Sequence, residues 1–361
     1  MSMRRVAPAI ALFFLSPLVA EFLLGDFTLA QLPFLVALAP AYGGAAVLVR
    51  EVTRRAGRGW VTMILLALAY GVLEEGLETQ SLFNPDYLDA HLLDHGFVPA
   101  LGIAIPWTLF VLTLHTVWSI SVPIALVEEW TVRRTEPWLR VPGLVVAAVL
   151  AAAGAVFTFG ISYADGHFMA SPAQLITTGA VVAALIVVAF RVPRPRTAAT
   201  VLPRDGAVAG PAVPADPALP ADHAVPADHA VLGAVVPGAV APAPWVVLVT
   251  ALAAGAMFVV GEGVPTALGV PLLIAALAGA AAAIYRWSGR DGWDGRHRLA
   301  AAGGALLTYV WHSFLMHPVI ESSTALVVVS HVVFALAALL LLAADVRRVR
   351  DRAPAAIQPV G

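Results

Sequence analysis

Long apolar runs alternate with short polar loops along most of the chain. A transmembrane helix needs roughly 20 apolar residues at about 1.5 Å per residue. Runs of about this length lie at 6–24, 32–49, 60–78, 99–127, 141–163, 173–190, 244–261, 266–285, 299–316 and 324–344. The run 99–127 is longer than one straight span requires, so we expect it to be tilted or broken at Pro106. The pattern predicts an all-α, polytopic integral membrane protein with about ten transmembrane helices.

The arginines give an independent test of this topology. They fall at the N-terminus, in every second loop and at the C-terminus: Arg4–Arg5, Arg50–Arg58, Arg133–Arg140, Arg191–Arg204, Arg286–Arg298 and Arg347–Arg352. The loops between these groups contain no basic residue. Because basic loops stay in the cytoplasm, both termini are predicted to be cytoplasmic. The chain has no lysine, which suits a GC-rich bacterial genome, so we expect it in a bacterial plasma membrane.

Composition agrees with this class and excludes several others. Hydrophobic residues make up 60% of the chain and charged residues only 12%, as in proteins that reside in a lipid bilayer. The absence of cysteine excludes disulfides, iron–sulfur clusters and thiol nucleophiles. The sequence contains no nucleic-acid signature, no GxSxG elbow and no phosphate-binding glycine loop. Pro8, Pro17 and Glu21 interrupt the first run, which we interpret as an uncleaved span rather than a signal peptide.

Residues 191–243 differ from the rest of the chain. They are rich in proline and alanine and contain no aromatic residue, which predicts a disordered, semi-extended cytoplasmic linker. The linker divides a six-helix part, 1–190, from a four-helix part, 244–346, and a basic cytoplasmic tail, 347–361, follows. His223 and His229 lie in a near-repeat of the linker; metal binding there is one interpretation and low-complexity duplication the other. No repeat relates the two membrane parts, which disfavours a transporter built from two related halves.

Three carboxylates, Glu74, Glu75 and Glu78, lie at the end of the third run. Glu74 and Glu78 are four residues apart, so on an α-helix they share a face with Tyr70. A carboxylate inside a bilayer costs several kcal/mol unless it is protonated, paired or solvated, so such residues usually have a function. The alternative is a helix end at the membrane interface. Glu78 is nearest the acidic loop that follows and is the most ordinary of the three.

Residue counting along the predicted spans places further polar side chains at a similar depth. Glu21, Glu74, Glu75, His115, His312 and His331 all fall in the predicted outer half of the bilayer. Trp118 and Ser119 share the helix face of His115. A pocket of carboxylates, imidazoles and hydroxyls can activate water or relay protons. For each histidine, a structural hydrogen bond to a neighbouring helix is the alternative interpretation.

A second pair of histidines lies in the predicted external loop 84–96. His91 and His95 are four residues apart, which on a helix directs both rings the same way, as zinc ligands require. No glutamate follows the first histidine, so this is not the HExxH sequence of metalloproteases. A metal-dependent site would use His91, His95, His115 or His312 as ligands. A site that activates water with a carboxylate requires no cofactor, and both possibilities stay open.

The order of Glu74-Glu75, then intramembrane His115, then His312 resembles the CAAX-processing and bacteriocin-processing (CPBP) membrane proteases. The resemblance implies that Glu74 or Glu75 is the base, with His115 and His312 polarising the water or the oxyanion. The motif is incomplete: Thr79 stands where the family has arginine, Met316 where it has asparagine or aspartate, and Phe110 is five residues before His115 instead of four.

These observations favour one hypothesis and two alternatives. The hypothesis is a glutamate-type intramembrane hydrolase, a peptidase or an enzyme acting on a lipid-linked substrate, which uses Glu74, Glu75, His115 and His312. Glu21, Glu78, Trp118, Ser119 and His331 would support that site. The first alternative is a proton- or ion-coupled transporter in which the same residues relay protons. The second alternative is a non-catalytic membrane subunit.

Overall fold

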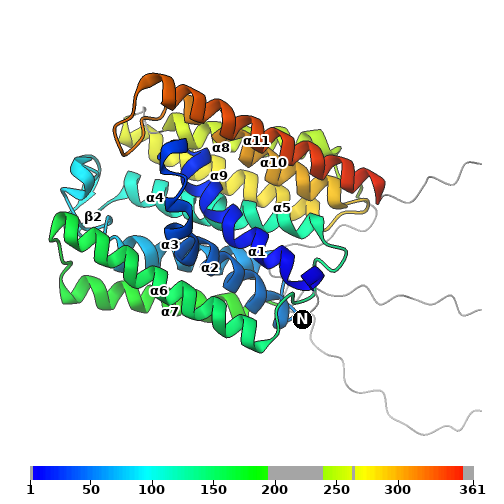
Figure 1. Cartoon of the computed structure of the whole chain (residues 1–361), viewed down its shortest axis with the longest axis horizontal. Coiled ribbons are helices and arrows are strands. Elements are labelled where there is room, and N and C mark those ends of the chain that lie inside the picture. The colour runs from blue at the N-terminus through cyan, green and yellow to red at the C-terminus, as the bar shows by residue number, and fades with distance from the viewer. Residues whose placement is uncertain (1–2, 194–238, 262–264, 353–361) are drawn as a thin grey trace, which may run out of the picture.

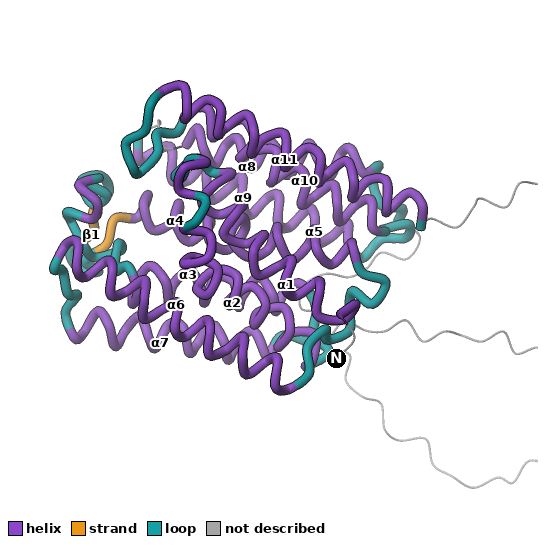
Figure 2. Tube along the Cα trace, in the orientation of Figure 1, coloured by secondary structure: helices purple, strands orange, loops and turns teal. Residues whose placement is uncertain are grey.

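The computed structural model describes residues 3–193, 239–261 and 265–352, most of them helical (Figure 1). Most of the predicted linker 191–243, with His223 and His229, therefore lies outside the described residues. Figure 2 shows that most loops lie toward the two ends of the helix bundle. The only paired strands in the described part are β1, Phe97–Val98, and β2, Ile103–Ala104.

The described helices follow the predicted runs closely. They are α1 (Met3–Pro17), α2 (Phe34–Arg55), α3 (Trp60–Leu73), α4 (Ile105–Leu114), α5 (Val122–Trp130), α6 (Val141–Gly166), α7 (Pro172–Arg191), α8 (Pro244–Val260), α9 (Thr266–Ser288), α10 (Gly295–His312) and α11 (Thr324–Asp351). The helix α11 continues past the predicted end at residue 344, so the arginines from Arg347 to Arg350 are helical. Short 3₁₀ turns lie at Leu29–Gln31, Tyr87–Asp89 and Ser313–Leu315.

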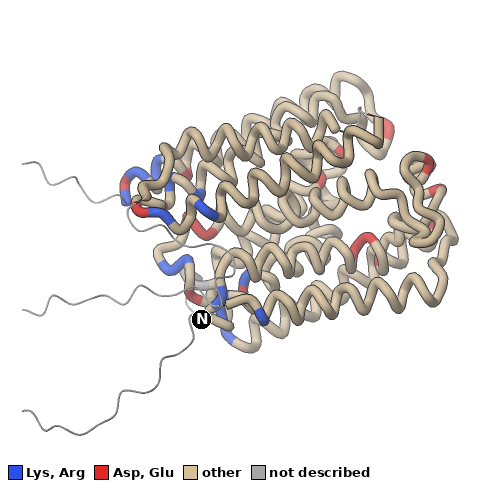
Figure 3. Tube along the Cα trace, turned by 180° about the vertical axis from the view of Figure 1, so that it is seen from behind, with Lys and Arg blue, Asp and Glu red and all other residues tan. Residues whose placement is uncertain are grey.

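Eight helical stretches in the described residues are long and apolar enough to cross a membrane. The helix α8 is apolar but shorter, and α10 begins with two arginines, Arg296 and Arg298. Figure 3 shows the arginines gathered at the end of the bundle that carries the N-terminus. The chain is thus a multi-span helical protein, while ten spans and a cytoplasmic location for this arginine end remain proposals.

The span from Ile105 to Trp130 lies at the centre of the bundle and joins its two hydrophobic cores. One side of the span contributes Ile120 and Ile124 to a core built with α1, α2 and α3. The other side contributes Trp118 and Leu126 to a core built with α8, α9, α10 and α11. The predicted run 99–127 is helical only from Ile105, because the residues before it form a turn and the strand β2. Pro106 does not break this helix. It lies in the first turn of α4, where a proline costs no helical hydrogen bond.

Glycines allow the closest helix contacts, as expected for helices that pack in a bilayer. A Cβ atom on Gly43 of α2 would overlap the backbone carbonyl of Phe13 in α1. The helices α8 and α10 approach in the same way, since a Cβ on Gly304 would overlap the carbonyl of Leu248. Backbone cannot rotate away as a side chain can, so any larger residue must separate the helices.

We therefore expect Gly43→Val to destabilise the protein by about 3 kcal/mol, at the upper end of overpacking effects. The midpoint of thermal unfolding in detergent checks this. Gly160→Val is the control, because Gly160 of α6 has open space where a Cβ would lie. Equal midpoints for the two variants would contradict the close α1–α2 contact.

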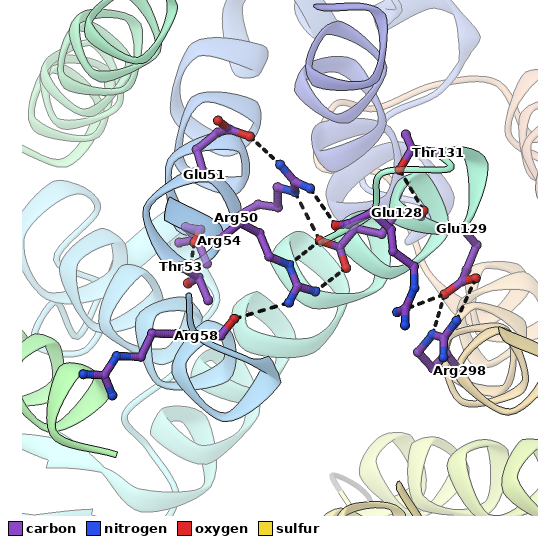
Figure 4. A network of polar contacts seen from close by, with 11 residues as sticks. Arg50, Glu51, Thr53, Arg54, Arg58, Glu128, Glu129, Thr131 and Arg298 are labelled. Atoms are coloured by element: carbon purple, nitrogen blue, oxygen red, sulfur yellow. Dashed lines mark hydrogen bonds and ion pairs between the residues drawn. The ribbon is translucent and has the colours of Figure 1, made fainter. Parts of the chain in front are cut away.

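A buried ionic network joins the helices at the arginine end (Figure 4). The Glu128 carboxylate of α5 accepts hydrogen bonds from Arg50 Nε at 3.1 Å and from Arg54 at 2.8 and 2.6 Å. Glu51 accepts from Arg50 at 2.5 Å and from the backbone N–H groups of Trp138 and Leu139. The Arg50 guanidinium also lies 3.5 Å from the centre of the Trp138 ring.

The network extends to the second hydrophobic core. Glu129 accepts hydrogen bonds from Arg298 of α10 at 2.6 and 3.2 Å. Arg352, after the end of α11, donates to the backbone carbonyls of Glu129, Trp130 and Thr131. Adjacent glutamates of α5 thus connect α2 on one side and α10 and α11 on the other. Sequence reasoning used these arginines only as topology markers.

Candidate functional site

Three spans change from α-helix to π-helix at the level of the predicted site. The π-helical segments are Leu18–Leu23, Glu74–Glu78 and His115–Ser121. The hydrogen bonds show the wider turn, since Thr79 N–H donates to the Glu74 carbonyl five residues back at 2.9 Å. Short π-helical insertions occur often at functional sites. Here they carry Glu21, the three glutamates and His115.

Glu74, Glu75 and His115 meet in the interior. His115 Nε2 lies 2.6 Å from Glu74 Oε2 and 2.7 Å from Glu75 Oε1. All three residues are at most 5% exposed, so their side chains face the protein interior at the end of the span rather than its surface. One ring nitrogen carries at most one hydrogen, so Nε2 can donate to only one of the two carboxylates at a time. We call this group the Glu–Glu–His cluster.

Glu75 is held in place by further donors. Its Oε2 accepts a hydrogen bond from Ser81 Oγ, and Thr79 Oγ1 lies 3.2 Å from the same oxygen. Trp107 Nε1 donates to Ser81 Oγ at 3.1 Å. Thr79, at the position where CPBP proteases have arginine, therefore contacts Glu75 directly. These contacts fix the orientation of the carboxylate.

Aromatic rings enclose His115. The Tyr42 ring stacks on the imidazole at a centroid distance of 5.9 Å, and the Tyr70 ring meets it edge-on at 6.0 Å. Ser119 Oγ lies 3.2 Å from Nδ1, the other ring nitrogen. Gly71 makes the approach of α3 possible, because a Cβ there would lie 3.1 Å from His115 Cβ. The imidazole is thereby fixed with Nε2 directed at the glutamates.

Glu21 and Glu78 add two carboxylates around the cluster. Tyr42 forms a hydrogen bond with the half-buried Glu21. Glu78, at the end of the π-helical segment, is 5% exposed, so its side chain is as buried as those of the pair. Its Oε2 has no hydrogen-bond partner among the described residues. A buried carboxylate is costly unless it is protonated, solvated or paired with a cation.

The structure places the remaining predicted residues elsewhere. Trp118 stacks between Phe258 and Tyr309 and donates to the Ala305 carbonyl at 2.8 Å, so its contacts are those of core packing. His331 lies against Gly25 and the Phe314 ring. His312 contacts the rings of Tyr309 and Trp311. Within the described residues, no hydrogen bond or ion pair joins His312 or His331 to the Glu–Glu–His cluster.

His91 and His95 do not lie on a helix. Both are exposed in a loop of turns. His91 has a positive φ of 50° and its nearest acid is Asp94, at 4.0 Å. The helical spacing that suggested a shared zinc ion is therefore absent. The donor set in the described residues that fits a metal is Glu74, Glu75 and His115, whose ligand atoms lie within 4.8 Å of one another. Two carboxylates and one imidazole suit zinc.

The long apolar helices are typical of a membrane protein. The buried glutamates form a polar site in its interior. A family model for an uncharacterized membrane protein family matches residues 10–351. The chain belongs to this family. Comparison with curated proteins and with solved structures gave no match. Membership and the apolar helices agree that this is a multi-pass protein of a lipid bilayer.

Several contact residues of this family member escaped sequence reasoning. Tyr42, Ser81 and Trp107 were not predicted, because each is a single polar or aromatic residue whose direction depends on tertiary packing. Thr79 was considered only as a missing arginine. The short distance from Glu75 to Ser81 also depends on the π-helical turn and the positive φ of 56° at Gln80. A projection of the sequence onto a regular α-helix predicts neither the π-helical turn nor the positive φ.

Proposed function

We propose that this membrane protein is an intramembrane peptidase that activates water beside Glu74 and His115. The observation that carries the proposal is the contact of two buried carboxylates with one imidazole nitrogen, at 2.6 and 2.7 Å. A general base must lie within hydrogen-bond reach of the proton that it moves, and this cluster supplies such groups away from bulk water. The resemblance to CPBP proteases supports the same assignment.

Glu74 is the better placed of the two bases. Glu75 is occupied by His115, Ser81 and Thr79, so we assign it the role of positioning the imidazole. Among the described residues, the polar contacts of the Glu74 carboxylate are with His115 and Glu75, which leaves lone pairs for a water molecule.

In the proposed reaction, Glu74 takes a proton from water, and the water oxygen attacks the scissile carbonyl. The hydrogen on His115 Nε2 stabilises the oxyanion that forms. As the C–N bond breaks, protonated Glu74 returns its proton to the leaving amine. No described hydrogen bond or ion pair joins His312 to the cluster, so we assign it no role in this reaction.

A transporter would use the same groups to relay protons across the membrane. Peptide cleavage and proton flux therefore distinguish the two functions. Proteoliposomes that contain the protein, single-span peptides and a pH-sensitive dye report both in one sample. We expect peptide cleavage without proton flux. Flux without cleavage would overturn the proposal in favour of transport. A non-catalytic subunit predicts neither, with Glu75→Ala and His115→Ala lowering only the folding yield.

Metal dependence is a separate prediction. We expect cleavage to persist in the presence of a zinc chelator, since Glu74 can act as base without a cofactor. Activity that disappears on chelation and returns with added zinc would contradict this. It would assign the ion to Glu74, Glu75 and His115, whose positions fit a divalent cation.

A further inference from the structure

An apolar groove runs between α8, α10 and α11 at the arginine end of the bundle, far from the Glu–Glu–His cluster. It has a volume of about 580 Å³, and its walls are formed by Leu248, Leu299, Ala300, Leu342, Val346 and Val349. Figure 1 shows the three helices side by side along one edge of the molecule. A groove with these walls on a membrane protein accommodates hydrocarbon.

Arginines line the polar end of this groove. Arg296 of α10 and Arg350 of α11 belong to its lining, and Arg347 borders the adjoining hollow on α11. Two neighbouring arginines contact the bundle instead: Arg348 of α11 lies over the Trp130 ring, and Arg352, just after α11, donates to backbone carbonyls. The sequence of α11 thus directs alternate arginines to the bundle and to the groove.

Among the described residues, the groove arginines have no strong ionic partner. No ion pair joins Arg347 or Arg350 to a carboxylate of the described residues. Arg296 has only Asp294, at 3.8 Å, with both side chains about half exposed. Such an exposed pair contributes little. The positive charge at this end of the groove is therefore available to an anion.

We propose that this groove binds an anionic phospholipid of the adjacent leaflet. The phosphate would lie between the guanidinium groups of Arg296 and Arg350, which match phosphate oxygens in geometry and charge. An acyl chain would lie along Leu248, Leu342 and Val346. Basic pockets between transmembrane helices recognise anionic headgroups in this way.

Two features at the start of α8 suit the same ligand. Trp245 lines the groove and is 68% exposed, as tryptophans are at the headgroup level of a membrane. The first turn of α8 has no capping side chain, and the positive end of the helix dipole there favours a negative charge. A zwitterionic lipid would gain less from this end because it carries no net charge.

The test uses delipidated full-length protein with phosphatidylglycerol or phosphatidylcholine as the probe. Native mass spectrometry measures retained lipid, and thermal unfolding measures stabilisation. We expect phosphatidylglycerol to be retained in preference to phosphatidylcholine. The double variant R296Q/R350Q should lose roughly five-fold in affinity for each arginine removed. The matched control is R133Q/R140Q, which removes two exposed arginines from the loop between α5 and α6.

A third variant separates the groove from general surface charge. Val346→Trp keeps every arginine but fills the groove from its 42% exposed wall position, so it should also lower retention. Equal losses in R296Q/R350Q and R133Q/R140Q would overturn the proposal, since they would reflect only the overall positive field. Equal retention of both lipids, or unchanged retention by Val346→Trp, would overturn it as well.

Discussion

Replacing Glu74 by glutamine is expected to lower the rate constant of peptide cleavage by about 10³-fold or more. General base catalysis typically contributes 10²- to 10⁴-fold. Glutamine keeps the shape of the side chain but cannot take a proton from water. The 2.6 Å contact of Glu74 with His115 Nε2 survives as a hydrogen bond to the amide oxygen, so the fold should be retained. Cleavage of a single-span peptide in proteoliposomes measures the effect.

Glu78→Gln is the matched control for this experiment. Glu78 lies in the same π-helical turn and is buried like Glu74, but no contact joins it to His115 among the described hydrogen bonds and ion pairs. We expect its cleavage rate to stay within a few-fold of the wild type. Full activity in Glu74→Gln, with a large loss in Glu78→Gln, would refute the assignment of the base.

Replacing Glu128 by alanine is expected to destabilise the protein by about 3–5 kcal/mol, the usual cost of removing one partner from a buried ion pair. Glu128 accepts hydrogen bonds from both Arg50 and Arg54, and Arg50 is fully buried. Without this carboxylate, Glu51 alone is left to balance two guanidinium groups inside the protein. The midpoint of unfolding, measured in detergent at constant lipid content, checks the effect.

An exposed ion pair of the neighbouring loop provides the control. Glu136 pairs with Arg133 at 3.5 Å, and both side chains are more than half exposed. Glu136→Ala should change the stability by less than about 1 kcal/mol, as expected for surface pairs. If the two alanine variants unfold at the same midpoint, the network of Figure 4 does not stabilise the bundle.

Hydropathy alone predicted most of the helical fold, because the bilayer demands long apolar helices with internally satisfied backbones. It also identified Glu74, Glu75 and His115, since such residues are rare and costly in apolar spans. Helical spacing predicted that Ser119 shares a helix face with His115, and the Ser119 hydroxyl does lie beside the imidazole. The predicted depth in the bilayer was a weaker guide to the site. His312 and His331 share the predicted layer, but no described hydrogen bond or ion pair joins them to the cluster.

The remaining features depend on tertiary geometry. Tyr42 and Trp107 reach the site only because α2 and α4 pack beside α3, which no local pattern encodes. The hydropathy pattern predicts a loop at Arg50 and Glu51, yet both residues are buried near the end of α2. Their partner Glu128 is 78 residues away from Arg50 in sequence. Such long-range ion pairs cannot be recognised from a single sequence.

The central claim is that the Glu–Glu–His cluster hydrolyses a peptide bond with water. Cleavage of single-span peptides in H₂¹⁸O tests it most directly, with wild-type and Glu74→Gln proteins prepared in parallel. We expect one ¹⁸O atom in each new carboxyl group formed by the wild-type protein and almost no product from the variant. Labelled product at equal rates from both proteins, or proton flux without any product from the wild type, would contradict it.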